Sequence, residues 1–278
     1  MVSEALAQTL KTFDPHRHRL VALTGAGVSA ESGIPTFRGN DGFWRIGSRD
    51  YQPQEIATME TFRQYPEKVW QWYLYRLGLC RSAAPNPGHA ALAAVEAHLK
   101  DRFTLITQNV DGLHLAAGNT RARTLEIHGN LSYLRCAREC TPGITPLPLP
   151  GTRRDRDTPL TEAEAAQLHC PYCGGWARPH VLWFDEIYNE HYYRAETALG
   201  AANRASLLLV AGTSGATNLP NRIVYQAARR GVTIIEINVA PSPFSRLVTG
   251  SPGGGFIQAP AGEVLPEMAT LLSGRNSG

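Results

Sequence analysis

Short runs of consecutive apolar residues alternate along the chain with longer segments in which apolar residues recur at helical spacing. The runs predict buried strands of a parallel sheet, and the spaced segments predict the helices that cover it. We expect strands at 19–24, 103–107, 124–127, 182–185, 206–211 and 233–237, and helices at 3–12, 55–64, 66–79, 89–99 and 261–272. This alternation is typical of an α/β protein with a Rossmann-like, doubly wound parallel sheet, whose ligands bind at the carboxyl ends of the strands.

The first apolar run is followed by a glycine-rich stretch, which reads GAGVSAESGIPTFR over residues 25–38. Glycine lets backbone N–H groups approach an anion, so a strand that turns into Gly25-Ala26-Gly27 predicts a phosphate-binding loop. Ala30 stands where the usual dinucleotide fingerprint has its third glycine, and a tight turn without a ligand is the alternative. The loop that starts at Pro35 carries an aromatic ring and a guanidinium, which suit a segment that folds over a bound pyrophosphate and ribose.

Four of the five cysteines form two close pairs, Cys136 with Cys140 and Cys170 with Cys173. Two such pairs can converge as a tetrahedral thiolate site, the usual arrangement of a structural zinc, with unliganded cysteines as the alternative. Residues 141–159 are rich in proline, arginine and glycine, and we expect an exposed and poorly ordered insertion there.

The amino-acid composition and the net charge argue against some classes of protein. The chain has 278 residues, of which 43% are apolar and 18% charged, as in soluble globular proteins. A net charge of only +3 argues against a nucleic-acid or membrane binder. The N-terminus does not read as a signal peptide and no apolar run is long enough to span a bilayer, so we expect a cytoplasmic protein. The oligomeric state is left open, and a monomer is compatible with the sequence.

Taken together, the glycine-rich stretch and four further blocks resemble the sirtuins, the NAD-dependent protein deacylases. In order, these blocks are TQNVD at 107–111, EIHG at 126–129, the two cysteine pairs, and GTS at 212–214 with EIN at 236–238. The resemblance runs from about residue 20 to about residue 257 and implies one catalytic domain over residues 1–278. It implies a Rossmann-like lobe at about 1–38, 84–132 and 177–278, a helical and cofactor-loop module at about 39–83, and a zinc-binding module at about 133–176.

The resemblance also implies residue roles. His128 matches the general base that accepts a proton from a hydroxyl of the nicotinamide ribose, and Asn109 is the second expected catalytic residue. A lone histidine is more often structural, and the other histidines lack such a setting. NAD is the implied co-substrate. The expected NAD-binding residues, for which turn chemistry is the alternative, are Gly25, Ala26, Gly27, Ser29, Ala30, Glu31, Pro35, Phe37, Arg38, Trp44, Gln108, Asn109, Val110, Asp111, Gly212, Thr213, Ser214, Asn238 and Phe256.

Tyr73 and Arg76 are three positions apart and therefore share a face of the expected helix. On pattern alone they read as a core aromatic and a solvated arginine. Sirtuins selective for acidic acyl groups, however, carry a Tyr-x-x-Arg here with an alanine upstream, a position that Ala57 matches. Guanidinium and phenol can bind a carboxylate by charge-assisted hydrogen bonds, so the resemblance favours succinyl-, malonyl- or glutaryl-lysine over acetyl-lysine.

Residues 178–186 resemble the segment that receives an acylated-lysine protein or peptide as an added strand, with Val181, Trp183 and Phe184 as expected contacts. Asp185 stands where the family usually has glycine, and Gly215 where many members have an apolar residue. Both departures lie beside the peptide groove and leave the preferred peptide sequence open.

Two rival functions remain. An NAD glycohydrolase or ADP-ribosyltransferase would use the same site with water or an arginine as acceptor, and the expected acyl channel argues against it. A non-enzymatic NAD or ADP-ribose sensor, or a zinc-ribbon binding module, would not need His128, Asn109 and Asp111 together.

Overall fold

The computed structural model describes residues 2–36, 44–46 and 49–274. In chain order the elements are α1 (Glu4–Lys11), β1 (Leu20–Thr24), α2 (Gly27–Ala30), β2 (Trp44–Ile46), β3 (Arg49–Tyr51), α3 (Pro53–Ile56), α4 (Met59–Gln64), α5 (Pro66–Ser82), α6 (Pro87–Leu99), the short 3₁₀ helix η1 (Lys100–Arg102), β4 (Phe103–Thr107), α7 (Leu113–Ala116), β5 (Thr124–Glu126), β6 (Gly129–Cys136), β7 (Ile144–Pro146), α8 (Glu162–Gln167), β8 (Ala177–Val181), α9 (Glu190–Tyr193), α10 (Ala195–Asn203), β9 (Leu207–Ala211), α11 (Asn218–Arg229), β10 (Thr233–Asn238), α12 (Ser245–Thr249), β11 (Gly255–Gln258) and α13 (Ala261–Ser273).

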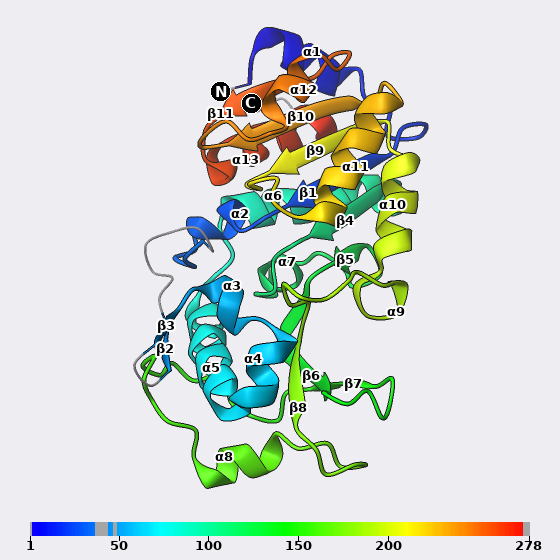
Figure 1. Ribbon diagram of the computed structural model, residues 1–278. Coiled ribbons are helices and arrows are strands. Elements are labelled where there is room, and N and C mark those ends of the chain that lie inside the picture. Colours follow the sequence, from blue (N-terminus) through cyan, green and yellow to red (C-terminus); the bar gives the residue numbers. More distant parts are fainter. Residues whose placement is uncertain (1, 37–43, 47–48, 275–278) are drawn as a thin grey trace.

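A parallel sheet of six strands forms the upper part of the molecule in Figure 1, in the order β11-β10-β9-β1-β4-β5. From β1 the chain first builds outward through β4 and β5, then returns to the other side of β1 with β9 and continues to β10 and β11. The strand order therefore reverses between β1 and β9. In open parallel sheets, ligands bind at this switch point, beyond the carboxyl ends of the strands.

Alternating side chains of the buried strands supply two separate cores. Leu20 and Ala22 of β1 face one cluster, which α1, α6 and α13 complete, whereas Val21 and Leu23 face a second cluster completed by α10, α11 and α12. Successive strand residues point to opposite faces, so a continuous apolar run fills both layers at once. The predicted doubly wound α/β fold is confirmed.

A second group of elements lies below this sheet in Figure 1. Here the antiparallel sheet β7-β6-β8 packs with α3, α4 and α5 around a third cluster, in which Trp70 and Trp183 are almost fully buried. Arg135 on β6 and Arg178 on β8 are also buried, at 2% and 0% exposure. The predicted division of the chain into modules stays a prediction.

The strand predicted at 182–185 is wrong in position. The strand is β8, at Ala177–Val181, and it pairs antiparallel with β6 instead of joining the parallel sheet. Pattern reasoning missed it because Arg178 and His180 are polar and yet buried. Arg178 is compensated by Glu186, which accepts hydrogen bonds from both of its terminal nitrogens. A paired charge can thus occupy a position that the pattern reserves for apolar residues.

The insertion at 141–159 is mostly exposed, as its composition predicts, but it is not the poorly ordered segment that we expected. Ile144–Pro146 forms β7 against β6, and Leu147 and Leu149 are only 8% and 4% exposed in the third core cluster. These two leucines supply the apolar burial that the surrounding prolines and arginines do not. The helix expected at 55–64 is likewise two helices, because Ala57 leaves the helical conformation and Thr58 caps α4.

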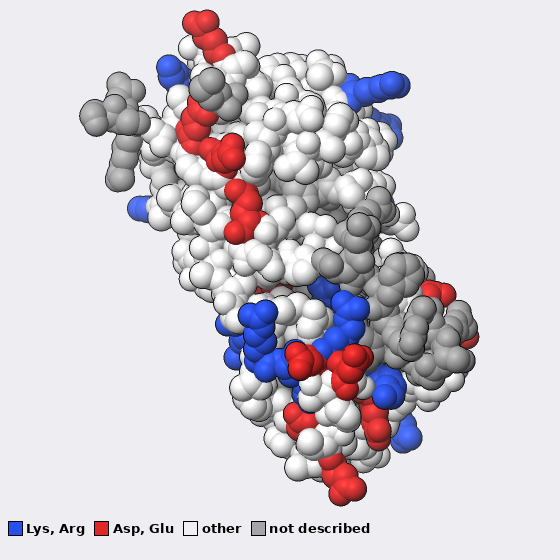
Figure 2. Space-filling model, turned by 90° about the vertical axis from the view of Figure 1, so that its left-hand side faces the viewer, with Lys and Arg blue, Asp and Glu red and all other residues white. Residues whose placement is uncertain are grey.

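On the face seen in Figure 2, a line of acidic side chains crosses the upper part, whereas basic and acidic side chains are intermixed on the lower part. The presence of both signs agrees with the small net charge of +3. Within the described part of the chain, no helix combines the length and apolarity needed to cross a membrane.

Candidate active site and metal centre

The loops that follow β1 and β9 meet at the switch point of the sheet. The Gly27 N–H donates to the Gly212 carbonyl at 2.8 Å, and a Cβ on Gly27 would lie only 2.7 Å from the Gly212 Cα. Gly212 itself has φ of +60°, a conformation that L side chains rarely adopt. Glycine is therefore required at both positions, and the two loops hold each other in place.

The hydroxyl of Ser29 is hydrogen-bonded to the polar residues of this site. Ser29 is 1% exposed; it donates to Asp111 Oδ2 at 2.8 Å and accepts from Asn109 Nδ2 at 3.0 Å. Asn109 and Asp111 follow β4, so the ends of two neighbouring strands bring an amide and a carboxylate together, as the sequence predicts. Such a pair can bind a carboxamide and ribose hydroxyls.

His89 also belongs to this cluster, which sequence reasoning missed when it singled out His128 alone. Its Nε2 lies 3.3 Å from Ser29 Oγ, and its ring lies 4.8 Å from that of His114, whose Nε2 is 3.0 Å from Thr24 Oγ1. Burial lowers the pKa of His114 to about 3 and also lowers the pKa of His89, although Asp111 opposes the latter shift. The Asn86 cap at the start of α6, which accepts from the Gly88 and His89 N–H groups, was the available sequence signal.

His128 lies just beyond β5, at the same edge of the sheet. Its Nε2 is 2.7 Å from the hydroxyl of Tyr188. Burial lowers the pKa of His128 to about 4, and a hydrogen bond to the backbone of Gln108 partly opposes this shift. The Gln108 side chain in turn donates to Thr213 Oγ1 at 2.8 Å, which connects the histidine to the loop after β9. At neutral pH the imidazole is thus uncharged and has the form of a base.

The remaining expected NAD-binding residues are spread around these loops. Asn238 donates to the Thr213 carbonyl at 2.9 Å, Ser214 is exposed, and Phe256 on β11 is half-buried. Glu31 is engaged elsewhere, because its carboxylate accepts the Gly262 N–H at 2.7 Å where α13 begins. Ala26, Ala30 and Pro35 lie on the first loop or its short helix, and Val110 is buried in the third core cluster. Phe37 and Arg38 lie outside the described residues, and Trp44 is on β2.

The expected acyl-binding residues lie in the third core cluster or beside it. Ala57 and Tyr73 are 3% and 4% exposed, and the Tyr73 hydroxyl accepts a hydrogen bond from the Trp183 indole at 2.7 Å. The guanidinium of Arg76 lies 5.1 Å from the centre of the Trp72 ring, and Arg76 lines a small cavity of about 40 Å³ with Pro35. Burial raises the pKa of Tyr73, and the nearby Arg76 charge acts in the opposite direction.

The segment after β8 is fixed by two acidic residues. Glu186 accepts the Trp183 N–H at 2.8 Å, and Asp185 accepts the N–H groups of Met59 and Glu60 at 2.9 and 3.2 Å. Asp185 therefore caps α4, which explains a carboxylate in place of the usual glycine. Of the expected peptide contacts, Trp183 is buried and Val181 is a buried strand residue, whereas Phe184 is 56% exposed.

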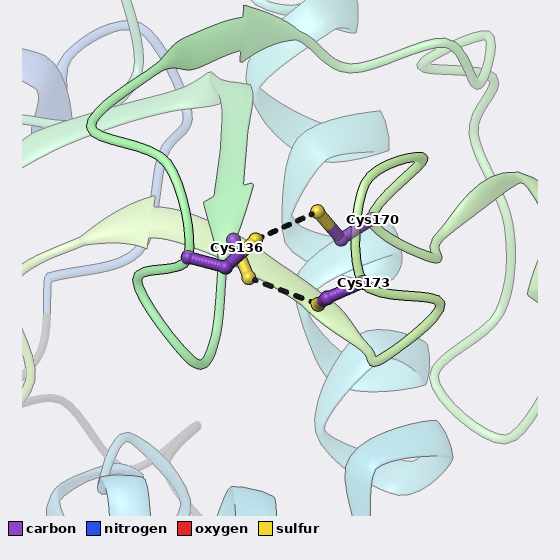
Figure 3. A group of neighbouring side chains, drawn as sticks. Cys136, Cys170 and Cys173 are labelled. Atoms are coloured by element: carbon purple, nitrogen blue, oxygen red, sulfur yellow. Dashed lines mark hydrogen bonds between the residues drawn. The ribbon is translucent and has the colours of Figure 1, made fainter.

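The four paired cysteines converge as their spacing predicts. All four sulfurs lie within 4.8 Å of one another, with Cys136 and Cys173 3.6 Å apart and Cys140 and Cys170 3.5 Å apart (Figure 3). A tetrahedral zinc with bonds of about 2.3 Å separates its sulfurs by about 3.8 Å, so the geometry fits this ion. The backbone N–H groups of Tyr172 and Cys173 lower the pKa of Cys170 to about 7, which favours the thiolate that zinc needs.

Comparison with known proteins agrees with this arrangement. A family model described as Sir2 family matches residues 25–218. A protein of Leptospira interrogans named NAD-dependent protein deacylase is 38% identical over 253 residues, covering 90% of this chain and 91% of that protein. The structure of a mutant Sir2 homologue with 2′-O-acetyl ADP ribose is 35% identical, with a TM-score of 0.79 over 100% of this chain and 99% of the other. A Sir2 homologue in complex with NAD matches at 35% identity and a TM-score of 0.78, over 98% and 94%.

Acid should destabilise the protein through four histidines, of which His89, His114 and His180 are buried and His128 is half-buried. In the folded chain the pKa values of His89, His114, His128 and His180 lie below the ordinary 6.5, because burial disfavours the charged ring. Their contribution is therefore complete well above the ordinary pKa of 6.5 and is lost as the pH falls below it, by up to about 1.4 kcal/mol per pH unit for each histidine. Urea unfolding between pH 7 and pH 5 measures the slope of the free energy of unfolding against pH.

His114→Gln should flatten that slope by about one proton, whereas His98→Gln, at an exposed position, should leave it unchanged. The same slope in both variants would contradict the explanation.

The cysteine cluster should bind about one zinc per chain, measured by elemental analysis of the purified protein. Cys173→Ser should lose the zinc and lower the melting temperature, because the cluster joins the turn after β6 to the loop before β8. Cys80→Ser is the matched control, since Cys80 is buried and lies outside the cluster. A fully folded protein without metal would contradict the assignment.

Proposed function

The chain belongs to the Sir2 family, and from this premise we propose that it is an NAD-dependent protein-lysine deacylase that favours succinyl-, malonyl- or glutaryl-lysine over acetyl-lysine. The observation that carries the proposal is the cluster at the switch point. There the Ser29 hydroxyl is hydrogen-bonded to both Asn109 and Asp111, and His128 stands as a neutral base at the end of a nearby strand. Relatives named NAD-dependent protein deacylase and a homologue bound to NAD support the same activity.

In the proposed reaction, the acyl oxygen of the modified lysine attacks C1′ of the nicotinamide ribose and nicotinamide leaves. Asn109 and Asp111 bind the carboxamide and the ribose hydroxyls, and Ser29 holds both side chains in position. His128 then takes the proton of a ribose hydroxyl, whose oxygen attacks the acyl carbon. Water releases free lysine, and the acyl group stays on ADP-ribose. A zinc ion held by the four cysteines would take no part in these steps, because four thiolates would fill its coordination sphere.

The proposed preference for an acidic acyl group depends on Arg76. Its guanidinium is half-buried and close enough to Tyr73 and Cys80 to lower the pKa of both groups, against the larger effect of burial. A carboxylate that reached Arg76 would form a charge-assisted hydrogen bond in surroundings poor in water. Tyr73 keeps its own O–H proton for a ligand, because the Trp183 indole donates to the tyrosine oxygen.

His128→Ala should retain NAD binding while turnover falls by roughly a hundredfold or more, the usual range for a lost general base. NAD affinity is measured by calorimetry, and turnover by chromatography of nicotinamide and O-acyl-ADP-ribose. His98→Ala removes an exposed imidazole and should leave both unchanged. Near-normal turnover in His128→Ala would contradict the assignment of His128 as the general base. Formation of free ADP-ribose without the acyl ester would indicate a glycohydrolase instead.

Arg76→Met should lower kcat/KM for a succinyl-lysine peptide by roughly thirtyfold to a thousandfold, because the substrate carboxylate would lose its charged partner. The kcat/KM for the matching acetyl-lysine peptide should change little or rise. Arg63→Met on the exposed side of α4 is the control and should affect neither substrate. An equal loss on both peptides would mean that Arg76 supports the fold or NAD binding.

A further inference from the structure

The residue nearest to the reactive nitrogen of His128 is one that neither the motifs nor the resemblance pointed to. Tyr188 lies in the segment after β8, and its hydroxyl is 2.7 Å from His128 Nε2, with the two rings 5.7 Å apart. Burial raises the pKa of Tyr188 to about 12 and lowers the pKa of His128 to about 4. Near neutral pH both side chains are therefore uncharged, and the tautomer of the imidazole decides which of them donates the hydrogen bond.

The other side of the imidazole is held by the backbone of Gln108. The two contacts together select one tautomer, in which the nitrogen facing Gln108 bears the proton and Nε2 carries the lone pair. This is the tautomer that a base acting through Nε2 requires. Its lone pair is, however, already occupied by the Tyr188 O–H, so a second hydroxyl reaches the base only if the first one leaves.

Tyr188 is tied to one of the departures from the family pattern. The nearby Thr217 side chain acts to lower the pKa of Tyr188, against the larger effect of burial, and the Thr217 hydroxyl donates to Gln108 Oε1 at 3.0 Å. Thr217 follows Gly215, which has φ of +65° and whose Cβ would lie 3.2 Å from the Phe244 ring. The changed loop after β9 thus presents a hydroxyl to the tyrosine that contacts the base.

The tyrosine also has space to move into. Tyr188 lines an open cavity of about 620 Å³ between the segment after β8 and α11, with Ile187, Asn218 and Tyr225 among the other lining residues. A ring that turns toward this cavity exchanges its contact with His128 for solvent, at a cost near that of one ordinary hydrogen bond.

This step rests on the proposed function, in which His128 is the base. We propose that Tyr188 is a positioning residue whose hydroxyl donates to the Nε2 lone pair of His128 in the substrate-free protein. When NAD binds, its ribose hydroxyl replaces the Tyr188 hydroxyl at this lone pair. Tyr188 holds the imidazole in the reactive tautomer and competes with the substrate for the same lone pair. Only the hydrogen bond is exchanged, and the tyrosine proton stays on its oxygen.

The acidic groups near the pair are engaged with other partners, and Arg222 and Arg229 line the cavity beside Tyr188. Glu126, two residues before His128, accepts from Asn130 at 2.6 Å, and Asp111 accepts from Ser29 and from the Leu113 N–H. Glu186, two residues before Tyr188, is paired with Arg178 and Arg135. Among the described residues, the polar contacts of the imidazole are Tyr188 and the Gln108 backbone alone. A pH effect of changing Tyr188 therefore reports on this hydrogen bond.

Tyr188→Phe tests the proposal by steady-state kinetics with varied NAD at a saturating acyl-lysine peptide, from pH 4.5 to pH 8. Loss of the competing hydroxyl should raise kcat/KM for NAD by roughly twofold to tenfold, the range of one neutral hydrogen bond. The acidic limb of the pH profile should move to higher pH, because a hydrogen bond donated to the neutral imidazole lowers its pKa. Tyr225→Phe removes a hydroxyl from the same cavity wall and should do neither.

An NMR titration of His128 in the NAD-free full chain provides a readout that does not need turnover. Tyr188→Phe should raise the pKa of His128, and Tyr225→Phe should not. An unchanged His128 pKa, or a lower kcat/KM with an unmoved acidic limb, would overturn the proposal. A normal turnover of His128→Ala would instead remove the general-base assignment while leaving the NMR result intact, so the two failures are distinguishable.

Discussion

The site depends on the contact between the two glycine loops at the switch point of the sheet. Gly27 and Gly212 approach so closely that a single added methyl group would collide with backbone on the opposite loop. Backbone contacts of this kind do not yield as a long side chain does, so the ends of β1 and β9 are fixed relative to each other. Because α2 starts at Gly27, the position of Ser29 is set by the same contact. Asn109 and Asp111 are hydrogen-bonded to Ser29, so the same contact also fixes their positions.

Most of the parallel part of the fold was predictable, because apolar runs such as 206–211 are buried on both faces and have few alternatives. The blocks at the carboxyl ends of β1, β4, β5, β9 and β10 all fall at the same edge of the sheet, as parallel strands require. The short antiparallel sheet was not predictable in this way. Its strand β8 carries Arg178, which is buried only because Glu186, eight positions further along the chain, neutralises it.

The candidate site was predictable where a residue and its partner belong to a motif, and missed where the partner comes from elsewhere. Ser29, Asn109 and Asp111 lie within the glycine-rich and TQNVD blocks, whereas His89 comes from the start of α6 and Tyr188 from the segment after β8. Periodicity reports which face of an element is buried, and it does not report which distant residue shares a hydrogen bond. The contacts of His128 could therefore be found only in three dimensions.

The departure from the family pattern at Asp185 also has a mechanical consequence. Asp185 is bonded to the first amides of α4, and the neighbouring Phe184 N–H is bonded to the Ala57 carbonyl at 2.9 Å. These hydrogen bonds hold residues 57–60 and 184–185 against each other. Any motion of residues 184–185 must therefore carry the start of α4 with it, and α5, the helix that bears Arg76, follows α4 after a single intervening residue. A shift of the segment around Phe184 is thus transmitted through α4 to the helix that carries Arg76.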